Sequence, residues 1–194
     1  EGKDNQWALE FLKTWQAKPR QDSNNRKSFW ALKMGQPITL SQHLSIVADE
    51  SIDIASRATA LQMLGQTTQQ VSVKDIQPYI EHDEELLRLS AATIANLINP
   101  GFRAQALADL LVDERKAIRV AAARAMLDTY IPDAMKVSFN KAKDELVISS
   151  SQTLWRGEGQ LNYAMMHMAQ NDEVATEKAF KQAIEVDPKN DEKY

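Results

Sequence analysis

Three arginines recur at a fixed interval in this chain and strongly limit its possible folds. Arg57, Arg88 and Arg119 lie 31 residues apart, and each opens an Ala/Leu-rich stretch with helical spacing: RATALQML, RLSAATIANL and RVAAARAML. An interval of this size is typical of stacked helical hairpins, whose apolar faces are buried only against neighbouring copies. The sequence therefore predicts an all-α protein, an α–α superhelix (solenoid) that presents one long surface.

Composition agrees with a packed helical protein and narrows the range of functions. The 194 residues are 43% hydrophobic, with only six Gly and six Pro, which argues against a loop-rich or all-β chain. The formal net charge is −4 and no basic stripe is present, so we do not expect a nucleic-acid partner. No apolar run reaches the roughly 18 residues of a membrane span. No cysteine is available for disulfides or for covalent haem attachment.

The pattern divides the chain into three parts. Residues 1–37 are expected to form N-terminal capping helices and a linker, and residues 38–130 three helical hairpins. Residues 131–194 hold a long helix over 133–150, a polar stretch, a hairpin over 161–186 and the truncated start of another repeat. Because the chain begins without Met and ends abruptly, we interpret it as a piece of a longer protein. Trp7, Trp15 and Trp30 are expected to pack against the first repeat. Trp155, beside Arg156 and the glycines, is expected to be buried, and exposure at an interface is the alternative.

The turn inside each of the three hairpins carries an aspartate: Asp49, Asp83 and Asp113. With this aspartate and the recurring arginine, residues 38–130 resemble HEAT repeats. The resemblance implies a structural ladder, in which these aspartates and arginines make charge-assisted hydrogen bonds between neighbouring repeats. The uneven distance from aspartate to arginine predicts one imperfect rung. An anion site lined by the arginines is the alternative.

A second type of repeat follows near the C-terminus. Small and bulky residues lie at the spacings of the tetratricopeptide (TPR) motif: Ala164, Phe180, Ala183 and Pro188. Residues 157–188 therefore resemble one TPR repeat, and residues 133–150 a degenerate half-repeat beside it. Asn171 takes the place of the usual turn glycine, and His167 and Thr176 also depart from the motif. We expect a hairpin that is packed less tightly than the family norm.

The TPR resemblance also implies a groove for a protein or peptide partner. By motif position its lining would be Glu158, Leu161, Met165, Met168, Lys189 and Asn190. Methionine is deformable and suits a surface that accepts varied apolar partners. Alternatively, the methionines are ordinary core residues or contacts to a neighbouring repeat. The sequence leaves both interpretations open.

The N-terminal segment KDNQWALEFLKTWQ carries a further resemblance. It is similar to the segment that follows the last haem-attachment motif in bacterial multihaem c-type cytochromes, and the order of HEAT-like and TPR-like repeats fits their helical tails. The resemblance implies a haem-free C-terminal region of a periplasmic cytochrome, with haem elsewhere in the parent protein. The haem motif is absent from this chain, so no cofactor is expected within it.

Signals for catalysis or metal binding are missing from the pattern. There is no Gly-x-Ser-x-Gly elbow or Gly-rich phosphate loop, and His43, His82 and His167 are isolated from other ligand residues. His167 could ligate haem only if a haem domain packed nearby. The sequence therefore predicts a non-enzymatic scaffold for protein–protein interaction. The alternatives are a support module of an electron-transfer cytochrome, which would be periplasmic, and an adaptor for an RNA or an enzyme.

Overall fold

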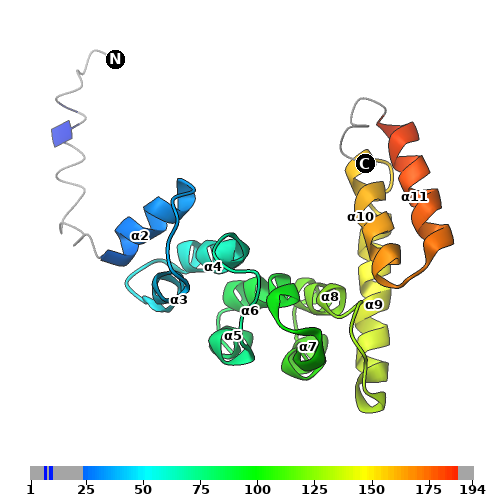
Figure 1. Ribbon diagram of the computed structural model, residues 1–194, viewed down its shortest axis with the longest axis horizontal. Helices are drawn as coiled ribbons and strands as arrows, with labels where there is room; N and C mark the ends of the chain where they lie inside the picture. The colour runs from blue at the N-terminus through cyan, green and yellow to red at the C-terminus, as the bar shows by residue number, and fades with distance from the viewer. Residues whose placement is uncertain (1–6, 8, 11–23, 188–194) are drawn as a thin grey trace.

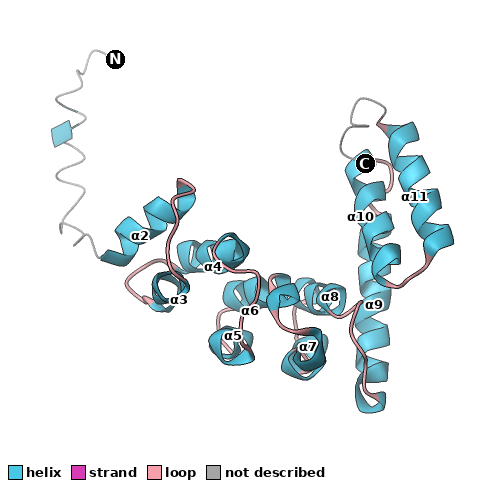
Figure 2. Cartoon of the chain, viewed as in Figure 1, coloured by secondary structure: helices cyan, strands magenta, loops and turns pink. Residues whose placement is uncertain are grey.

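Helices form all the regular structure in residues 7, 9–10 and 24–187, which are the residues that the computed structural model describes (Figures 1 and 2). The prediction of an all-α protein is confirmed for this part of the chain, where no strand occurs. Val71 and Ile98 form an isolated parallel β-bridge between two loops. The α-helices are α2 (Asn24–Lys33), α3 (Leu40–Ala48), α4 (Ile54–Gln62), α5 (Val73–Ile80), α6 (Glu85–Thr93), α7 (Pro100–Ala106), α8 (Lys116–Ala125), α9 (Lys136–Ser151), α10 (Gly157–Ala169) and α11 (Glu173–Val186).

Short 3₁₀ helices end or precede several of these elements. They are η1 (Met63–Gln66), η2 (Ala95–Leu97), η3 (Asp109–Val112) and η4 (Asp133–Met135). The spacing of apolar residues predicts single helices over 54–64, 86–98 and 102–111, but each stretch is divided into an α-helix and a 3₁₀ helix. The α-helix ends in each case at a C-cap residue whose ψ is close to 0°: Met63, Ile94 and Leu107. Backbone in this region tightens the last turn, which favours 3₁₀ over α geometry.

Helices α4, α6 and α8 form a row whose members begin 31 residues apart in sequence (Figure 1). Helix α4 packs on α6, α6 on α8, and α8 on the long helix α9, while α3 and α5 cover the other side of α4 and α6. Ala60, Ala91 and Ala122 occupy equivalent positions of the row and are fully buried. Because alanine has a small side chain, neighbouring helices can approach closely at these points.

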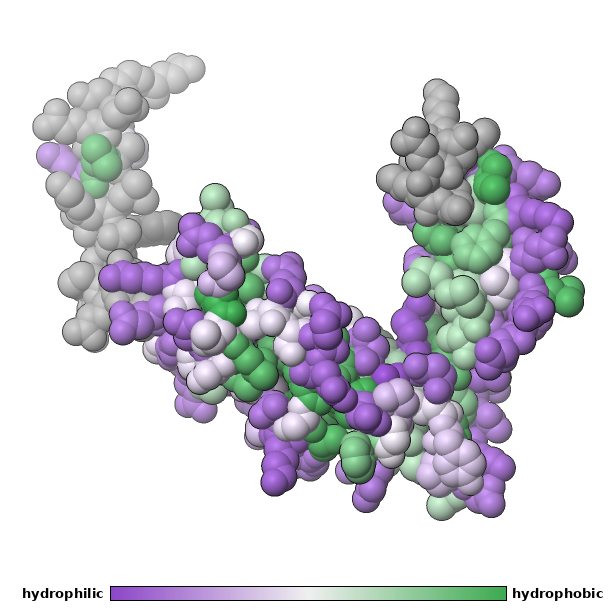
Figure 3. Space-filling model, viewed as in Figure 1, coloured by the Kyte–Doolittle hydropathy of each residue, from purple (hydrophilic) through white to green (hydrophobic). Residues whose placement is uncertain are grey.

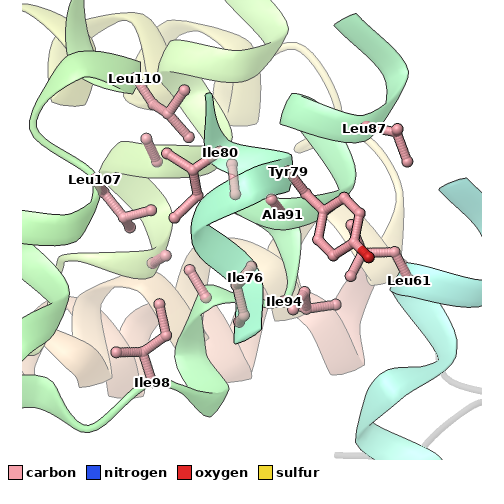
Figure 4. Close-up of a cluster of buried hydrophobic side chains, with 14 of the residues drawn as sticks. Leu61, Ile76, Tyr79, Ile80, Leu87, Ala91, Ile94, Ile98, Leu107 and Leu110 are labelled. Atoms are coloured by element: carbon pink, nitrogen blue, oxygen red, sulfur yellow. The ribbon is translucent and has the colours of Figure 1, made fainter. Parts of the chain in front are cut away.

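One continuous apolar core runs from α2 to α9. Its buried side chains extend from Leu32 to Ala142, and Figure 4 shows its middle, where Ile76 and Ile80 of α5 lie between residues of neighbouring helices. A smaller set of buried apolar residues lies outside that cluster, where the hairpin of α10 and α11 packs on α9. They are Leu146, Ala164, Met166, Ala179 and Ala183. The chain therefore contains two separate apolar interiors.

Local sequence signals set several helix boundaries. Thr39 caps α3 in a reciprocal box with Gln42, and the Asp53 carboxylate accepts the Ser56 N–H at the start of α4. Gly35 (φ 70°) and Asn171 (φ 57°) end α2 and α10 in the left-handed conformation. At both ends the following N–H groups bond back to the last turn in the Schellman pattern. Asparagine tolerates this conformation better than most residues, so the turn forms without the usual glycine.

Helix α10 begins earlier than the sequence predicted. Gly157 and Gly159, expected in a polar stretch before the helix, are its first and third residues, and both are buried. A Cβ atom at Gly159 would lie 1.8 Å from the Thr153 carbonyl oxygen. The glycine therefore allows α10 to pass directly against the turn that follows α9.

We expect Gly159→Ala to destabilise this end of the protein by about 1–3 kcal/mol, the usual cost of forcing a methyl group into packed backbone. Gly65→Ala is the matched control, because nothing lies within 4 Å of its Cβ position. A helical Gly→Ala change is ordinarily stabilising. Urea unfolding followed by circular dichroism measures both variants, and a Gly159→Ala protein as stable as the wild type would contradict the close contact.

The expected packing of Trp30 is wrong, and Trp155 is exposed, as in the alternative interpretation, and not buried. Trp30 is 64% exposed and Trp155 is 73% exposed, and each stacks with a cation, Lys33 and Arg156 respectively. Hydrophobic character alone does not distinguish the buried face of a helix from its outer face, and it is Leu32 that anchors α2 in the core. Trp7 is 44% exposed, and Trp15 lies outside the described residues.

Candidate functional site

Arg88 links two successive units of the row. Its Nη1 donates to the carbonyl oxygens of His82 and Asp83, in the turn of its own unit, at 2.8 and 2.7 Å. Its Nε donates to the carboxylate of Asp113 in the next unit at 2.7 Å. Burial by itself would raise the pKa of Asp113, but the bonds from Arg88 and from the Arg115 N–H, with the nearby positive charges, lower it. The carboxylate is therefore held in its ionised form.

Arg119 repeats this arrangement one unit later with a different acid. Its Nη1 donates to the carbonyl oxygens of Asp113 and Glu114, and its Nε and Nη2 donate to both carboxylate oxygens of Glu145 at 2.9 and 2.7 Å. These bonds lower the pKa of Glu145 and raise that of Arg119. Glu145 lies within α9, so this contact joins the row to the long helix. No motif had singled it out.

Arg57 does not follow the pattern. Its Nε donates to the Val47 carbonyl oxygen at 2.7 Å, and within the described residues no ion pair joins it to Asp83. Burial raises the pKa of the Tyr79 phenol, and the charge of Arg57 opposes this, which places the guanidinium near Tyr79. Asp49 accepts hydrogen bonds from Asn25 and Ser51 and so ties α2 to the first turn. The first of the three arginines therefore makes a different set of contacts from the other two.

Arg103 is a buried clamp that the sequence analysis missed. Its side chain is almost fully buried and donates to the carbonyl oxygens of Asn96, Ile98 and Ala125, and to the carboxylate of Asp128. These bonds connect α7 and the segment before it to the end of α8. The residue falls outside the 31-residue register of the other arginines, so periodicity could not reveal it.

Replacing Arg88 with Met should reduce the free energy of unfolding by about 2 kcal/mol, because it removes the charged partner of a carboxylate with only 7% side-chain exposure. Arg115→Met provides the control. Arg115 pairs with Glu85 at the surface, where both side chains are at least half exposed, and such pairs contribute about 0–1 kcal/mol. Equal losses in the two variants, measured by urea unfolding, would show that the Arg88 link does not stabilise the row.

His43 is a second buried polar residue, and it is fully enclosed between α3 and α4. Its Nε2 lies 2.6 Å from the Ala60 carbonyl oxygen and its Nδ1 lies 2.7 Å from the Thr67 hydroxyl. A carbonyl only accepts, so Nε2 carries the proton and the Thr67 hydroxyl donates to Nδ1. Burial lowers the pKa of His43, although the bond to Ala60 opposes the effect. The neutral imidazole is therefore a structural part of the first hairpin.

This geometry predicts a loss of stability in mild acid. The unfolded chain binds a proton at His43 near the ordinary pKa of about 6.5, whereas the folded chain does so only at lower pH. The stabilisation is thus complete above about pH 6.5 and declines as the pH falls below it. The difference in unfolding free energy between pH 7.5 and pH 5.5 should be smaller in His43→Gln than in the wild type. If this difference is the same in His43→Gln and in the wild type, groups other than His43 cause the loss of stability in acid.

The predicted groove residues on α10 fall on one face of the helix. Glu158, Leu161, Met165 and Met168 follow the i, i+3, i+7 and i+10 spacing of a helical stripe. Met165 is 52% exposed and Met168 is 56% exposed, whereas Met166 is buried. Met166 is thus the core residue of this helix. The two other methionines are surface residues on the described part of the chain.

Leu161, Met165 and Met168 together form what we term the α10 stripe. Leu161 is half-buried, and Glu158 lies exposed one turn before it. In Figure 3 the surface of α10 carries apolar side chains next to the polar surface of α11. Lys189 and Asn190, also predicted for the groove, lie outside the described residues. The stripe is therefore the part of the predicted groove that can be placed.

His167 lies behind the α10 stripe and is oriented by its neighbours. Its Nδ1 lies 3.3 Å from an Asp172 carboxylate oxygen, and its ring meets that of Tyr163 edge-on at 4.5 Å. Its Nε2 is buried and has no hydrogen-bond partner among the described residues. Because Nε2 is enclosed, a haem approaching from another domain could reach it only if the helices moved.

Other classes of site can be assessed for the described residues only. Within them, no three His, Asp or Glu side chains gather closely enough to hold a metal ion. None of the described helices has the length and apolar character needed to cross a membrane. Comparisons with protein-family models, with curated proteins and with solved structures find no match to this chain.

Proposed function

We propose that this chain is a non-enzymatic scaffold, an α–α superhelix of HEAT-like units with a TPR-like hairpin at its end, that holds a protein or peptide partner. The observation that carries the proposal is the α10 stripe, in which Met165 and Met168 remain more than half exposed on a helix that packs on α9 and α11. Adjacent exposed apolar side chains of this kind mark interaction surfaces more often than isolated ones do.

The α10 stripe suits an amphipathic or extended peptide. Its three apolar residues span two helical turns, and methionine side chains adjust their shape to different apolar partners. Glu158, at one end of the stripe, provides a polar boundary that can orient the partner. A partner segment with two or three large apolar residues on one face would match this surface.

The arginine links give the proposed scaffold its mechanism. Arg88 and Arg119 bind backbone carbonyls of one unit and a carboxylate of the next element, so the row is held in one arrangement before any partner arrives. A surface that is already ordered loses little conformational entropy on binding. This argument applies to the row, whereas the order of the α10 stripe depends on the packing of α10 against α11 and α9.

The test begins with a library of random peptides selected on the immobilised protein. The enriched peptides should carry large apolar residues, and Met165→Asp should weaken their binding by about tenfold or more, because it places a charge in the apolar contact. Fluorescence polarisation measures the affinities, and circular dichroism verifies that each variant is folded.

Val174→Asp is the matched control, because Val174 is 81% exposed on α11 and lies outside the α10 stripe. Its affinity for the same peptides should equal that of the wild type. Enriched peptides that bind Met165→Asp as tightly as the wild type would place the binding surface elsewhere. Equal weakening by both changes would point to a general effect of added negative charge.

A second proposal concerns the parent protein. The resemblance of residues 3–16 to the segment after a haem-attachment motif favours a C-terminal support module of a periplasmic multihaem cytochrome. Cys-x-x-Cys-His motifs upstream in the parent sequence, together with a haem Soret band in the full-length protein, would support it. Their absence would leave the scaffold as a separate protein.

A further inference from the structure

Arg124 differs from the other arginines of residues 38–130 because it has no partner among the described residues. Each of the others binds a backbone carbonyl or a carboxylate: Arg57, Arg88, Arg103, Arg115 and Arg119. Arg124, in the last turn of α8, has no hydrogen bond or ion pair with any described residue. Burial lowers the pKa of its guanidinium, and no carboxylate opposes this effect. Arg124 is thus a solvent-accessible cation without a counter-charge among the described residues.

The sequence register places Arg124 on the open side of the row. Gln62, Thr93 and Arg124 are 31 residues apart on α4, α6 and α8, and all three are solvent accessible. They lie on the opposite face of these helices from the buried Ala60, Ala91 and Ala122. Only the third position carries a charge. Arg124 is therefore the charged member of a set of equivalent positions that are otherwise neutral.

A hollow of about 420 Å³ surrounds this cation. It lies between α6 and α8, with small apolar walls and two polar residues, and its lining has no acidic side chain: Thr93, Asn96, Ala117, Val120, Ala121, Arg124 and Ala125. The Thr93 hydroxyl donates to the Leu89 carbonyl, so its proton is already used. The backbone of Asn96 is fixed by the buried Arg103. The Arg124 guanidinium and the Asn96 amide are the groups of the hollow that can donate to a ligand.

We propose that this hollow binds a carboxylate side chain, glutamate or aspartate, of the protein segment that the scaffold captures. Charge complementarity carries the assignment, because a planar guanidinium matches a carboxylate through two parallel hydrogen bonds. The small apolar walls contributed by Ala117, Val120 and Ala121 leave room for the methylene groups of such a side chain. The inference rests on the proposed function, since it names a second point of contact for the same partner.

Two short peptides on the whole protein test the inference: acetyl-Ala-Glu-Ala-amide and its glutamine counterpart, titrated at constant ionic strength. The NMR signals of the Arg124 Nε–H and the Asn96 side-chain amide should shift saturably with the glutamate peptide and not with the glutamine peptide. Arg124→Gln should weaken the binding by at least about tenfold, because it removes a charge-assisted bidentate contact. Arg156→Gln, at an exposed arginine outside the hollow, should leave it unchanged.

Three results would overturn the proposal. They are an equal response to the glutamine peptide, a response that persists in Arg124→Gln, and stronger saturable binding of sodium phosphate than of the glutamate peptide. Met165→Asp should leave the titration unchanged, because the α10 stripe lies on another helix. Failure of the carboxylate site is therefore distinguishable from failure of the α10 stripe as the main binding surface.

Discussion

Arginine side chains that reach from one helical unit to the next are the contacts on which the rest of this structure depends. Apolar burial drives the helices together, but it is not directional, and faces rich in alanine could pack in several registers. A guanidinium has five donors in a fixed plane, so Arg88 and Arg119 can bind the turn of one unit and the acid of the next element at the same time. Shared donors of this kind fix the alignment of successive units.

The helical class and the main boundaries could be predicted because their signals are local. The apolar spacing of residues 73–80 predicts a helix, and these residues form α5 with the same bounds. The repeat of arginine marks the first turns of α4, α6 and α8. The 3₁₀ segments and the early start of α10 depend on contacts between elements. The turn at Thr153 that requires Gly159 is recognised only when the two helices are seen together.

The positions of the recurring arginines could be predicted from the sequence, but the partners of these arginines could not. Arg88 pairs with Asp113, which lies in a turn 25 residues later in the sequence. Arg119 pairs with Glu145, which lies within a helix 26 residues later. An acidic residue 25 or 26 positions after an arginine is therefore a candidate for its ion-pair partner. The signal fails for Arg57, because Asp83 lies 26 residues after it and is not its partner. Exposure of the tryptophans and methionines likewise depends on which helix faces remain uncovered. Composition does not carry that information.

The two separate apolar interiors have a consequence for how the molecule comes apart. Cooperative unfolding extends only as far as packing is continuous, and the packing from α2 to α9 does not include the interior between α10 and α11. The terminal hairpin can therefore open while the row remains native. When the hairpin opens, Met165 and Met168 lose their arrangement on α10 while the row is unaffected. A ligand bound to them would therefore stabilise the hairpin and not the row. Partner binding at this end of the chain is in this way coupled to the opening and closing of the α10–α11 hairpin, which is separate from the unfolding of the row.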